Sequence, residues 1–217
     1  MDEPTIFTRT GEEVKFNIER TYTNPSHSNQ EITILAFIKD KTNIVFPYRF
    51  AGNLDAHFYP RPLDNVDFSE ITRKNDFSYD FDLKKINEKD YENHAYSYLS
   101  MVEVLYNERR KGVGSAMIDM MEHLFAKYSL EETTAKKGVI RGYFLPFAQG
   151  QRYSTEKFYR NNGFEFVKNA KIDLFKEIEP KKIIENSNCE IYDSFPVKDY
   201  IEYRGQGYNN EADFFGW

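Results

Sequence analysis

Apolar and polar positions in the first part of the chain follow a two-residue period. In Glu13–Tyr22 the two kinds alternate, which is typical of a strand with one buried face. In Glu31–Phe50 two apolar runs flank the polar stretch KDKTN, and this arrangement predicts a β-hairpin. The acidic stretch of residues 60–93 shows no clear period, and short helices are one alternative there. The first part is therefore predicted to consist mainly of strands and loops.

The period changes in the second part of the chain. Tyr98–Tyr106 (YLSMVEVLY) is rich in β-branched and aromatic residues, which predicts a strand. From Gly112 onward apolar residues recur at steps of three and four, the stripe of an amphipathic helix. These residues are Val113, Ala116, Met117, Met120, Leu124 and Tyr128. Gly138–Phe147 predicts the next strand.

A shorter helix and further strands are predicted beyond residue 153. In STEKFYRNNGF a capping-box-like Ser154 predicts the helix start and Gly163 its end. The following FEFVKNAKIDLFKEI predicts either a strand pair or one bent strand. From Glu177 a mixed tail ends in an acidic, aromatic segment, for which disorder and docking on the body or a partner are the alternatives. We expect a single domain over residues 1–176, with core motifs at 98–175 and a C-terminal extension at 177–217.

Composition narrows the class of protein. The chain has 217 residues, 40% apolar and 29% charged, which allows one packed domain. The formal net charge of −6 argues against an extended nucleic-acid surface. Cys189 is the single cysteine, so no intramolecular disulfide can form, which fits a reducing compartment. The acidic N-terminus does not resemble a signal peptide, and no apolar run approaches a membrane span, so we expect a cytoplasmic protein.

A basic stretch with two glycines joins the predicted strand to the predicted helix. Three cations, Arg109 to Lys111, come directly before Gly112 and Gly114. The first N–H groups of a helix have no internal partner, and the helix dipole adds partial positive charge there. Glycines let a ligand approach the backbone closely. The stretch therefore suits a phosphate or pyrophosphate, with a plain tight turn as the alternative.

Three well-known signatures do not fit this stretch. The dinucleotide fingerprint requires a third glycine where this chain has Met117. The P-loop sequence Gly-x-x-x-x-Gly-Lys-Ser/Thr does not occur. The His-Arg-Asp and Asp-Phe-Gly sequences of protein kinases are absent as well. The phosphate site must belong to another class.

The segment VEVLYNERRKGVGSAMIDMMEHL resembles the acetyl-coenzyme A motif of the GCN5-related N-acetyltransferases, the GNAT superfamily. The signature Arg/Gln-x-x-Gly-x-Gly/Ala is complete from Arg109 to Gly114, although Tyr106 replaces the usual Pro of the preceding strand. A second family signature, Tyr-x-x-x-Gly-Phe, is matched in FYRNNGF by Tyr159, Gly163 and Phe164.

The resemblance covers roughly residues 102–166, and the first ~97 residues do not match the family's helical acceptor lid. It implies an α/β (α+β) fold with a mixed, mostly antiparallel central sheet and flanking helices. The sheet would splay between its fourth and fifth strands to admit acetyl-CoA.

The resemblance also implies where acetyl-CoA binds. Backbone N–H groups from Arg110 to Ser115 would hold the pyrophosphate, and Arg109 would organise the loop or contact phosphate. Backbone groups of Val102 and Val104 would pair with the pantetheine arm like an added strand, and an amide there would polarise the thioester carbonyl. The implied cofactor-binding residues are Val102, Val104, Arg109, Arg110, Lys111, Gly112, Val113, Gly114 and Ser115.

Tyr159 is the implied general acid. A phenol with a pKa near 10 is suited to protonate a leaving thiolate whose thiol has a pKa near 8.5. The alternative for Tyr159 is a core aromatic on a helix face. Many family members have Asn seven residues before this Tyr, where this chain has Arg152.

An amine acceptor also needs a base, and Glu103 is the nearest candidate. Strand alternation places Glu103 opposite Val102 and Val104. The alternative is a solvent-facing or salt-bridged strand residue. Weaker candidates are Asp90, Glu92, His57 and His94, and the scattered His residues show no zinc spacing.

We therefore expect an N-acetyltransferase that moves an acetyl group from acetyl-CoA to a primary amine of a small-molecule or peptide acceptor by direct attack. The alternative is a catalytically weak or inactive interaction module on the same fold. No nucleic acid, membrane or metal is expected as a partner, and a homodimer is left open.

Overall fold

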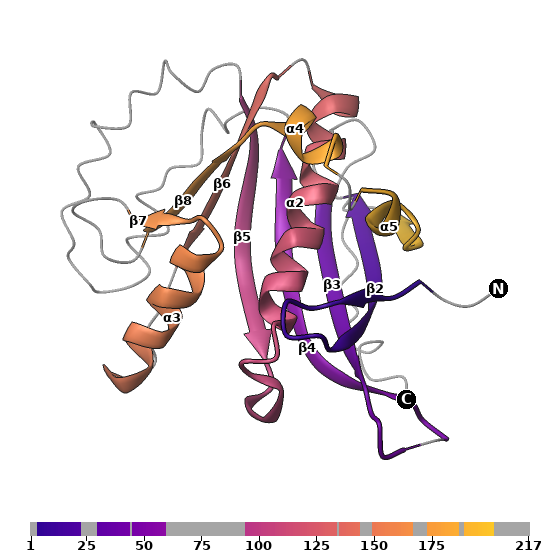
Figure 1. Ribbon diagram of the computed structural model, residues 1–217. Helices are drawn as coiled ribbons and strands as arrows, with labels where there is room; N and C mark the ends of the chain where they lie inside the picture. Colours follow the sequence, from indigo (N-terminus) through magenta and orange to yellow (C-terminus); the bar gives the residue numbers. More distant parts are fainter. Residues whose placement is uncertain are drawn as a thin grey trace, which may run out of the picture.

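The computed structural model describes residues 4–22, 30–43, 45–59, 94–133, 135–143, 149–166, 173–186 and 189–201. They form a nine-stranded sheet, and the long helix Val113–Glu132 packs against it (Figure 1). The strands are β1 Ile6–Phe7, β2 Glu13–Tyr22, β3 Gln30–Lys39, β4 Tyr48–Tyr59, β5 His94–Val104, β6 Lys137–Tyr143, β7 Glu165–Phe166, β8 Asp173–Ile178 and β9 Val197–Ile201. The helices are the short 3-10 turn η3 Tyr106–Glu108, α2 Val113–Glu132, α3 Gln149–Asn161, α4 Pro180–Ile184 and α5 Cys189–Asp193.

The sheet is mixed and mostly antiparallel. Its order is β1-β2-β3-β4-β5-β6-β8-β7, and β9 pairs with β2. Only two of the described strand pairs are parallel, β5 with β6 and β2 with β9. Parallel neighbours need a long connection, and α2 is the helix that crosses from β5 to β6. The predicted mixed, mostly antiparallel sheet with flanking helices is confirmed.

Most predicted elements are present with shifted ends. The strand Glu13–Tyr22 and the hairpin of β3 and β4 are confirmed, and β4 continues well beyond Phe50. The strand pair after α3, rather than one bent strand, is confirmed by β7 and β8. The predicted start of the second helix at Ser154 is wrong, because α3 already begins at Gln149. The segment QGQRY that opens α3 has no apolar period, so its helical state was not visible in the sequence.

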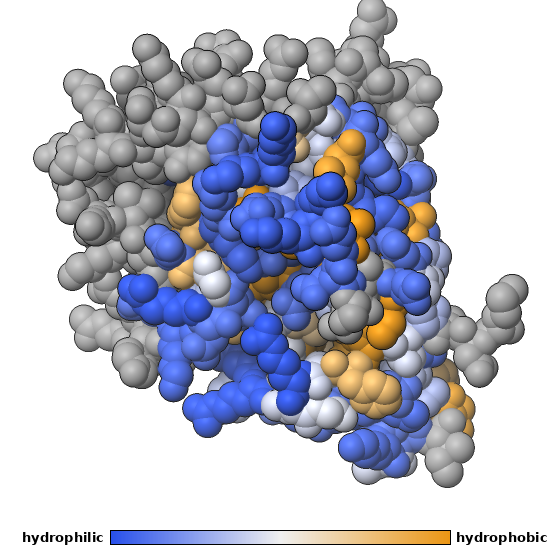
Figure 2. Space-filling view, turned by 45° about the horizontal axis from the view of Figure 1, so that its top comes forward, coloured by the Kyte–Doolittle hydropathy of each residue, from blue (hydrophilic) through white to orange (hydrophobic). Residues whose placement is uncertain are grey.

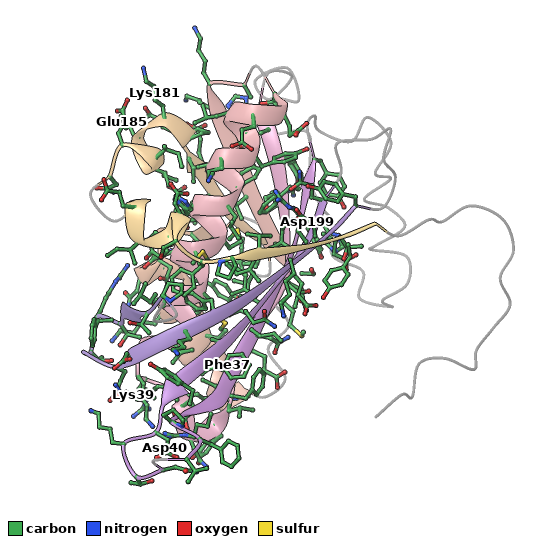
Figure 3. The ribbon with its side chains drawn as sticks, turned by 90° about the vertical axis from the view of Figure 1, so that its right-hand side faces the viewer. Phe37, Lys39, Asp40, Lys181, Glu185 and Asp199 are labelled. Carbon is green, nitrogen blue, oxygen red and sulfur yellow. The ribbon has the colours of Figure 1, made fainter. Side chains whose placement is uncertain are left out.

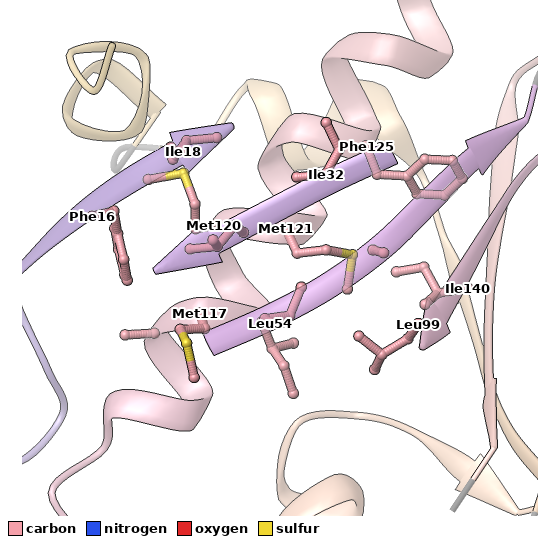
Figure 4. Close-up of a cluster of buried hydrophobic side chains, with 14 of the residues drawn as sticks. Phe16, Ile18, Ile32, Leu54, Leu99, Met117, Met120, Met121, Phe125 and Ile140 are labelled. Carbon is pink, nitrogen blue, oxygen red and sulfur yellow. The ribbon is translucent and has the colours of Figure 1, made fainter. Parts of the chain in front are cut away.

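One face of the sheet packs against α2 and holds the core (Figure 4). Met117, Met120, Met121 and Phe125 of α2 are fully buried there. Side chains from five neighbouring strands complete this cluster, among them Ile18, Ile32, Leu54, Leu99 and Ile140. Nearly every second side chain of β2, β3 and β4 points into this layer. The alternation of apolar and polar residues in these strands follows, because only one face of the sheet is buried.

The opposite side of the sheet is here called the distal face. It is formed by the side chains that alternate with the buried ones, and Phe37 lies on it, away from α2 (Figure 3). Cross-strand register places its members in rows: Asn17, Leu35, Asn53 and Glu103 form one, and Glu19, Thr33, Asp55 and Met101 form the next. These side chains are partly or fully exposed.

Described segments after Glu177 contact α2 and β2. α4 and α5 pack on α2, and β9 extends the sheet beside β2. On the surface seen in Figure 2 the described side chains are mostly hydrophilic, with hydrophobic ones in small groups. Two predicted segments lie outside the described residues. One is the acidic stretch with Asp90 and Glu92, and the other is residues 202–217, for which disorder and docking were the alternatives. None of the described helices is long and apolar enough to cross a membrane.

Candidate functional site

The loop between β5 and α2 presents the open end of a long helix. Gly112 is the N-cap at a positive φ of 79°, and Arg110 also has a positive φ, 66°. The first helical hydrogen bond runs from the amide of Ala116 to the carbonyl of Gly112, at 3.0 Å. The amides of residues 113–115 therefore have no acceptor within the helix. Together with the helix dipole, these donors suit an anion.

Glu108 stabilises this loop through hydrogen bonds to two cationic side chains. Its carboxylate is buried and accepts hydrogen bonds from Arg49 Nε and Lys111 Nζ, both at 2.9 Å. Burial alone raises the pKa of Glu108, but the hydrogen bonds and charges of Arg49 and Lys111 outweigh it, and the net pKa is lowered. Thr10 Oγ1 donates to the carbonyl of Lys111 at 2.7 Å. Sequence reasoning missed these partners; the only local signal was a carboxylate directly before the basic run.

The three predicted cations have different surroundings. Lys111 is paired with Glu108. Arg109 Nε donates to the carbonyl of Val104 at 3.2 Å, and its guanidinium lies 5.5 Å from the centroid of the Tyr106 ring. The hydrogen bond to Val104 ties the loop to the end of β5. Arg110 is exposed beside the helix entrance.

Both glycines of the motif are needed for packing as well. A Cβ on Gly112 would lie 2.9 Å from Thr8 Cβ, and the positive φ would strain any other residue. A Cβ on Gly114 would lie 3.0 Å from Phe158 Cε2 and 3.3 Å from Val104 Cγ2. Gly114 thus allows β5, α2 and α3 to meet at one point.

The pairing of β5 with β6 ends beside this point within the described residues. The last pair there is Leu99 with Gly142. Counted from β2, β5 and β6 are the fourth and fifth long strands. The sequence predicts that the sheet splays between these two strands to admit acetyl-CoA. From Ser100 to Val104, β5 pairs only with β4 within the described part of the chain. Its other edge carries backbone donors and acceptors that an extended ligand can pair with.

A β-bulge decides which side chains of β5 face α2. The register with β4 shifts at Ser100, whose hydroxyl donates to the carbonyl of Asp55 at 3.0 Å. The extra residue moves the alternation by one position. Val102 and Val104 therefore pack toward the core, while Glu103 is exposed on the distal face opposite Asn53.

Tyr159 lies on the other side of the sheet from Glu103. It is 7% exposed, and its ring packs against those of Phe158 and Phe164, with centroids 5.0 and 5.6 Å away. Burial raises the pKa of Tyr159 to about 12. Phe158 in turn contacts Gly114, so the structure brings Tyr159 near the first turn of α2.

The remaining candidates lie elsewhere. His57 is on the distal face, where it faces Tyr98 across the strands and stacks on Tyr59 at 6.4 Å. His94 Nε2 lies 3.9 Å from Glu177 at the start of β5, away from the bulge. In the part of the chain that the structure describes, no three His, Cys, Asp or Glu side chains gather as metal ligands.

Comparison with known proteins gives distant structural matches. No family model and no curated protein matches the chain. A mutant of the toxin AtaT, bound to the C-terminus of the antitoxin AtaR and acetyl-CoA, has 10% identity and a TM-score of 0.41, with 71% of each chain covered. NAA60 of Arabidopsis thaliana in complex with acetyl-CoA has 13% identity and a TM-score of 0.38, over 68% of this chain and 75% of that one. A putative GNAT-family acetyltransferase of Desulfovibrio desulfuricans has 13% identity and a TM-score of 0.33, over 68% and 69%.

Proposed function

We propose that the protein is an acetyltransferase that moves an acetyl group from acetyl-CoA to a primary amine within a ternary complex. One observation carries this proposal: the open N-terminus of α2 lies directly beside the stretch of β5, Ser100–Val104, that has no β6 partner among the described residues. A ligand with a pyrophosphate at one end and an extended arm at the other fits both features at once.

The residues present fit acetyl-CoA. The backbone amides from Arg110 to Ser115 would hold the pyrophosphate, since those that open the helix have no internal acceptor and the loop contains two positive φ angles. The backbone of Val102 and Val104 would pair with the pantetheine arm. When bound, acetyl-CoA supplies an activated acetyl thioester. Arg109 and Arg110 add positive charge around the phosphates, whereas Lys111 shares its charge with Glu108.

The two catalytic candidates would act from opposite faces of the sheet. Glu103, exposed on the distal face, would take the proton that an ammonium group must lose before it attacks. Tyr159, on the α2 face, would give its hydroxyl proton to the leaving sulfur. With a pKa of about 12, Tyr159 is fully protonated at neutral pH. In this arrangement the acceptor approaches from the distal face.

Calorimetry with acetyl-CoA tests the proposal, on wild type and on Ser115→Glu. Glycine variants would confound the test, because a Cβ at Gly112 or Gly114 is too close to its neighbours. A carboxylate in the first turn of α2 stabilises the helix but repels a pyrophosphate. We expect the variant to keep its Tm and to bind about 100-fold more weakly or worse, since like charges brought together cost several kcal/mol. Ser194→Glu, on an exposed serine after α5, should bind as wild type does. A folded wild type that does not bind acetyl-CoA would refute the proposal.

A catalytically inactive interaction module is the second candidate. The observation that favours it is the burial of Tyr159 between two aromatic rings, as expected of a core residue. The two candidates differ in thioester turnover. An enzyme releases free thiol from acetyl-CoA faster when a suitable amine is added, and Tyr159→Phe slows this release. A module would bind acetyl-CoA, or fail to bind it, without amine-dependent release.

A further inference from the structure

Lys176 of β8 lies where β8, α2 and α3 meet. Its ammonium group donates to the carboxylate of Glu122 on α2 and, at 2.8 Å, to the carbonyl of Asn162 at the end of α3. It also lies 5.6 Å from the centroid of the Phe164 ring. The side chains of Lys176 and Glu122 are only 20% and 11% exposed. One shielded ion pair therefore joins three elements.

The contact with Asn162 acts on the last turn of α3, which also carries Tyr159. The carbonyl of Tyr159 accepts the amides of Asn162 and Phe164, both at 3.0 Å. A Cβ on Gly163 would lie 3.3 Å from the Cε and Nζ of Lys176, so the backbone of this turn lies directly against the ammonium group. A cation at the C-terminal end of a helix is favourable, because the free carbonyls there carry partial negative charge.

The other end of this contact chain reaches the candidate phosphate site. Phe158, next to Tyr159, contacts Gly114 in the first turn of α2. Glu122 lies two turns further along the same helix. The backbone at Tyr159 is thus held between two points on α2, by Phe158 at Gly114 and by Lys176 at Glu122.

We propose that Lys176 and Glu122 form a positioning pair that fixes Tyr159 relative to the first turn of α2. The proposal rests on the proposed function, in which Tyr159 is the general acid. Stability alone is a weak reason for such a pair, because a buried ion pair often stabilises no better than apolar side chains of similar size. Burial raises the pKa of Glu122, and the charge and hydrogen bond of Lys176 oppose this effect. The pair instead gives the end of α3 a fixed, directional contact.

The test replaces the pair with apolar side chains of similar size. The double variant Lys176→Met, Glu122→Leu removes both charges and the bond to the Asn162 carbonyl, while leaving no unpaired buried charge. The control double variant Lys137→Met, Glu177→Leu removes an ion pair of 2.6 Å between β6 and β8 that does not touch α3. Should the first variant fail to fold by circular dichroism, Lys176→Arg takes its place, because it keeps the charge but changes the donor geometry.

Fluorine NMR of protein labelled with 3-fluorotyrosine reports on Tyr159, whose resonance is assigned from its loss in Tyr159→Phe. Without ligand, we expect one sharp Tyr159 resonance in wild type and in the control. The pair variant should give a shifted, broadened or split resonance. By calorimetry its Kd for acetyl-CoA should stay within about twofold of wild type, as expected for well-separated sites. On adding acetyl-CoA, the resonance should move in wild type and move less in the pair variant.

The outcomes separate the two proposals. A pair variant whose Tyr159 resonance matches wild type, with and without acetyl-CoA, overturns the positioning role. A wild type that does not bind acetyl-CoA overturns the proposed function, and the positioning of a general acid with it. The ligand-free spectra still decide in that case whether the pair fixes the place of Tyr159.

Discussion

The two faces of the sheet differ in packing and in chemistry. On the α2 face, Phe58 and Phe125 are almost fully buried and their rings lie 5.1 Å apart. On the distal face, side chains stay partly exposed, and Asp55 and Glu103 place carboxylates there in adjacent rows. The candidate acid Tyr159 belongs to the first face and the candidate base Glu103 to the second. Under the proposed function, the first face would supply stability and a protonated phenol, and the second would admit the amine.

The largest expected effect contrasts core packing on the two faces. Phe125→Ala should cost about 3–5 kcal/mol of unfolding free energy, because it leaves a cavity among buried side chains. Phe37→Ala, on the distal face, should cost about 1 kcal/mol of unfolding free energy, because Phe37 is only half-buried. The centroid of its ring lies 5.9 Å from that of Phe50. Urea unfolding of both variants measures the difference. Equal losses would show that the distal face is packed as tightly as the α2 face.

The second largest expected effect concerns Glu103, the candidate general base. Glu103→Gln should lower the rate of amine-dependent thiol release about 100-fold at pH 7, the usual size of general-base catalysis. The loss should shrink as the pH rises toward the pKa of the amine, because the acceptor then deprotonates in solution. Glu31→Gln, which changes another carboxylate of the distal face, is the matched control and should stay close to wild type. A pH-independent loss in Glu103→Gln would rule out the base role.

Structural features that depend on neighbouring residues in the sequence were predicted, whereas features that depend on contacts between distant residues were not. The alternation in β2, β3 and β4 follows from burial of one face, and the period change at Gly112 marks the start of α2 within one residue. The start of α3 at Gln149 was missed because its first residues lack an apolar period.

The bulge at Ser100 was also missed, since YLSMVEV gives no sign of an extra residue. In the candidate site, the glycine motif of residues 109–114 and the tyrosine motif of residues 159–164 can be recognised directly in the sequence. The contacts of Glu108 with Arg49 and of Thr10 with Lys111 join residues far apart in the chain, so no local pattern reveals them.

The third effect concerns Glu108, whose buried carboxylate pairs with two cations in the loop before α2. Glu108→Gln should lose about 1–2 kcal/mol of unfolding free energy at pH 7, because Arg49 and Lys111 lose an ionised partner. The folded pKa of Glu108 is lowered, so its contribution is present above the unfolded value of about 4.3 and lost as the pH falls through the folded value. Urea unfolding at pH 7 and pH 3 should show the gap to wild type closing.

The matched control for Glu108 is Glu156→Gln. Glu156 pairs with Arg160 on the exposed side of α3, and such pairs contribute about 0.5 kcal/mol or less. A gap for Glu108→Gln that persists at pH 3 would mean that the shape of the side chain matters, and not its charge.

The smallest expected effect concerns a polar group on the α2 face. Ser97 is fully buried between Phe58 and Ile140 of the neighbouring strands, and its hydroxyl has no hydrogen-bond partner within the described residues. An unpaired buried hydroxyl costs free energy, so Ser97→Ala should leave stability unchanged or raise it by up to about 1 kcal/mol. Ser129 is equally buried, but its hydroxyl donates to the Phe125 carbonyl at 2.7 Å, so Ser129→Ala should be destabilising by up to about 1 kcal/mol. Opposite signs in urea unfolding would show that this face tolerates polar groups only where they are paired. A clear loss of stability in Ser97→Ala would instead mean that its hydroxyl has a partner, such as a buried water, and that the α2 face is less dry than its packing indicates.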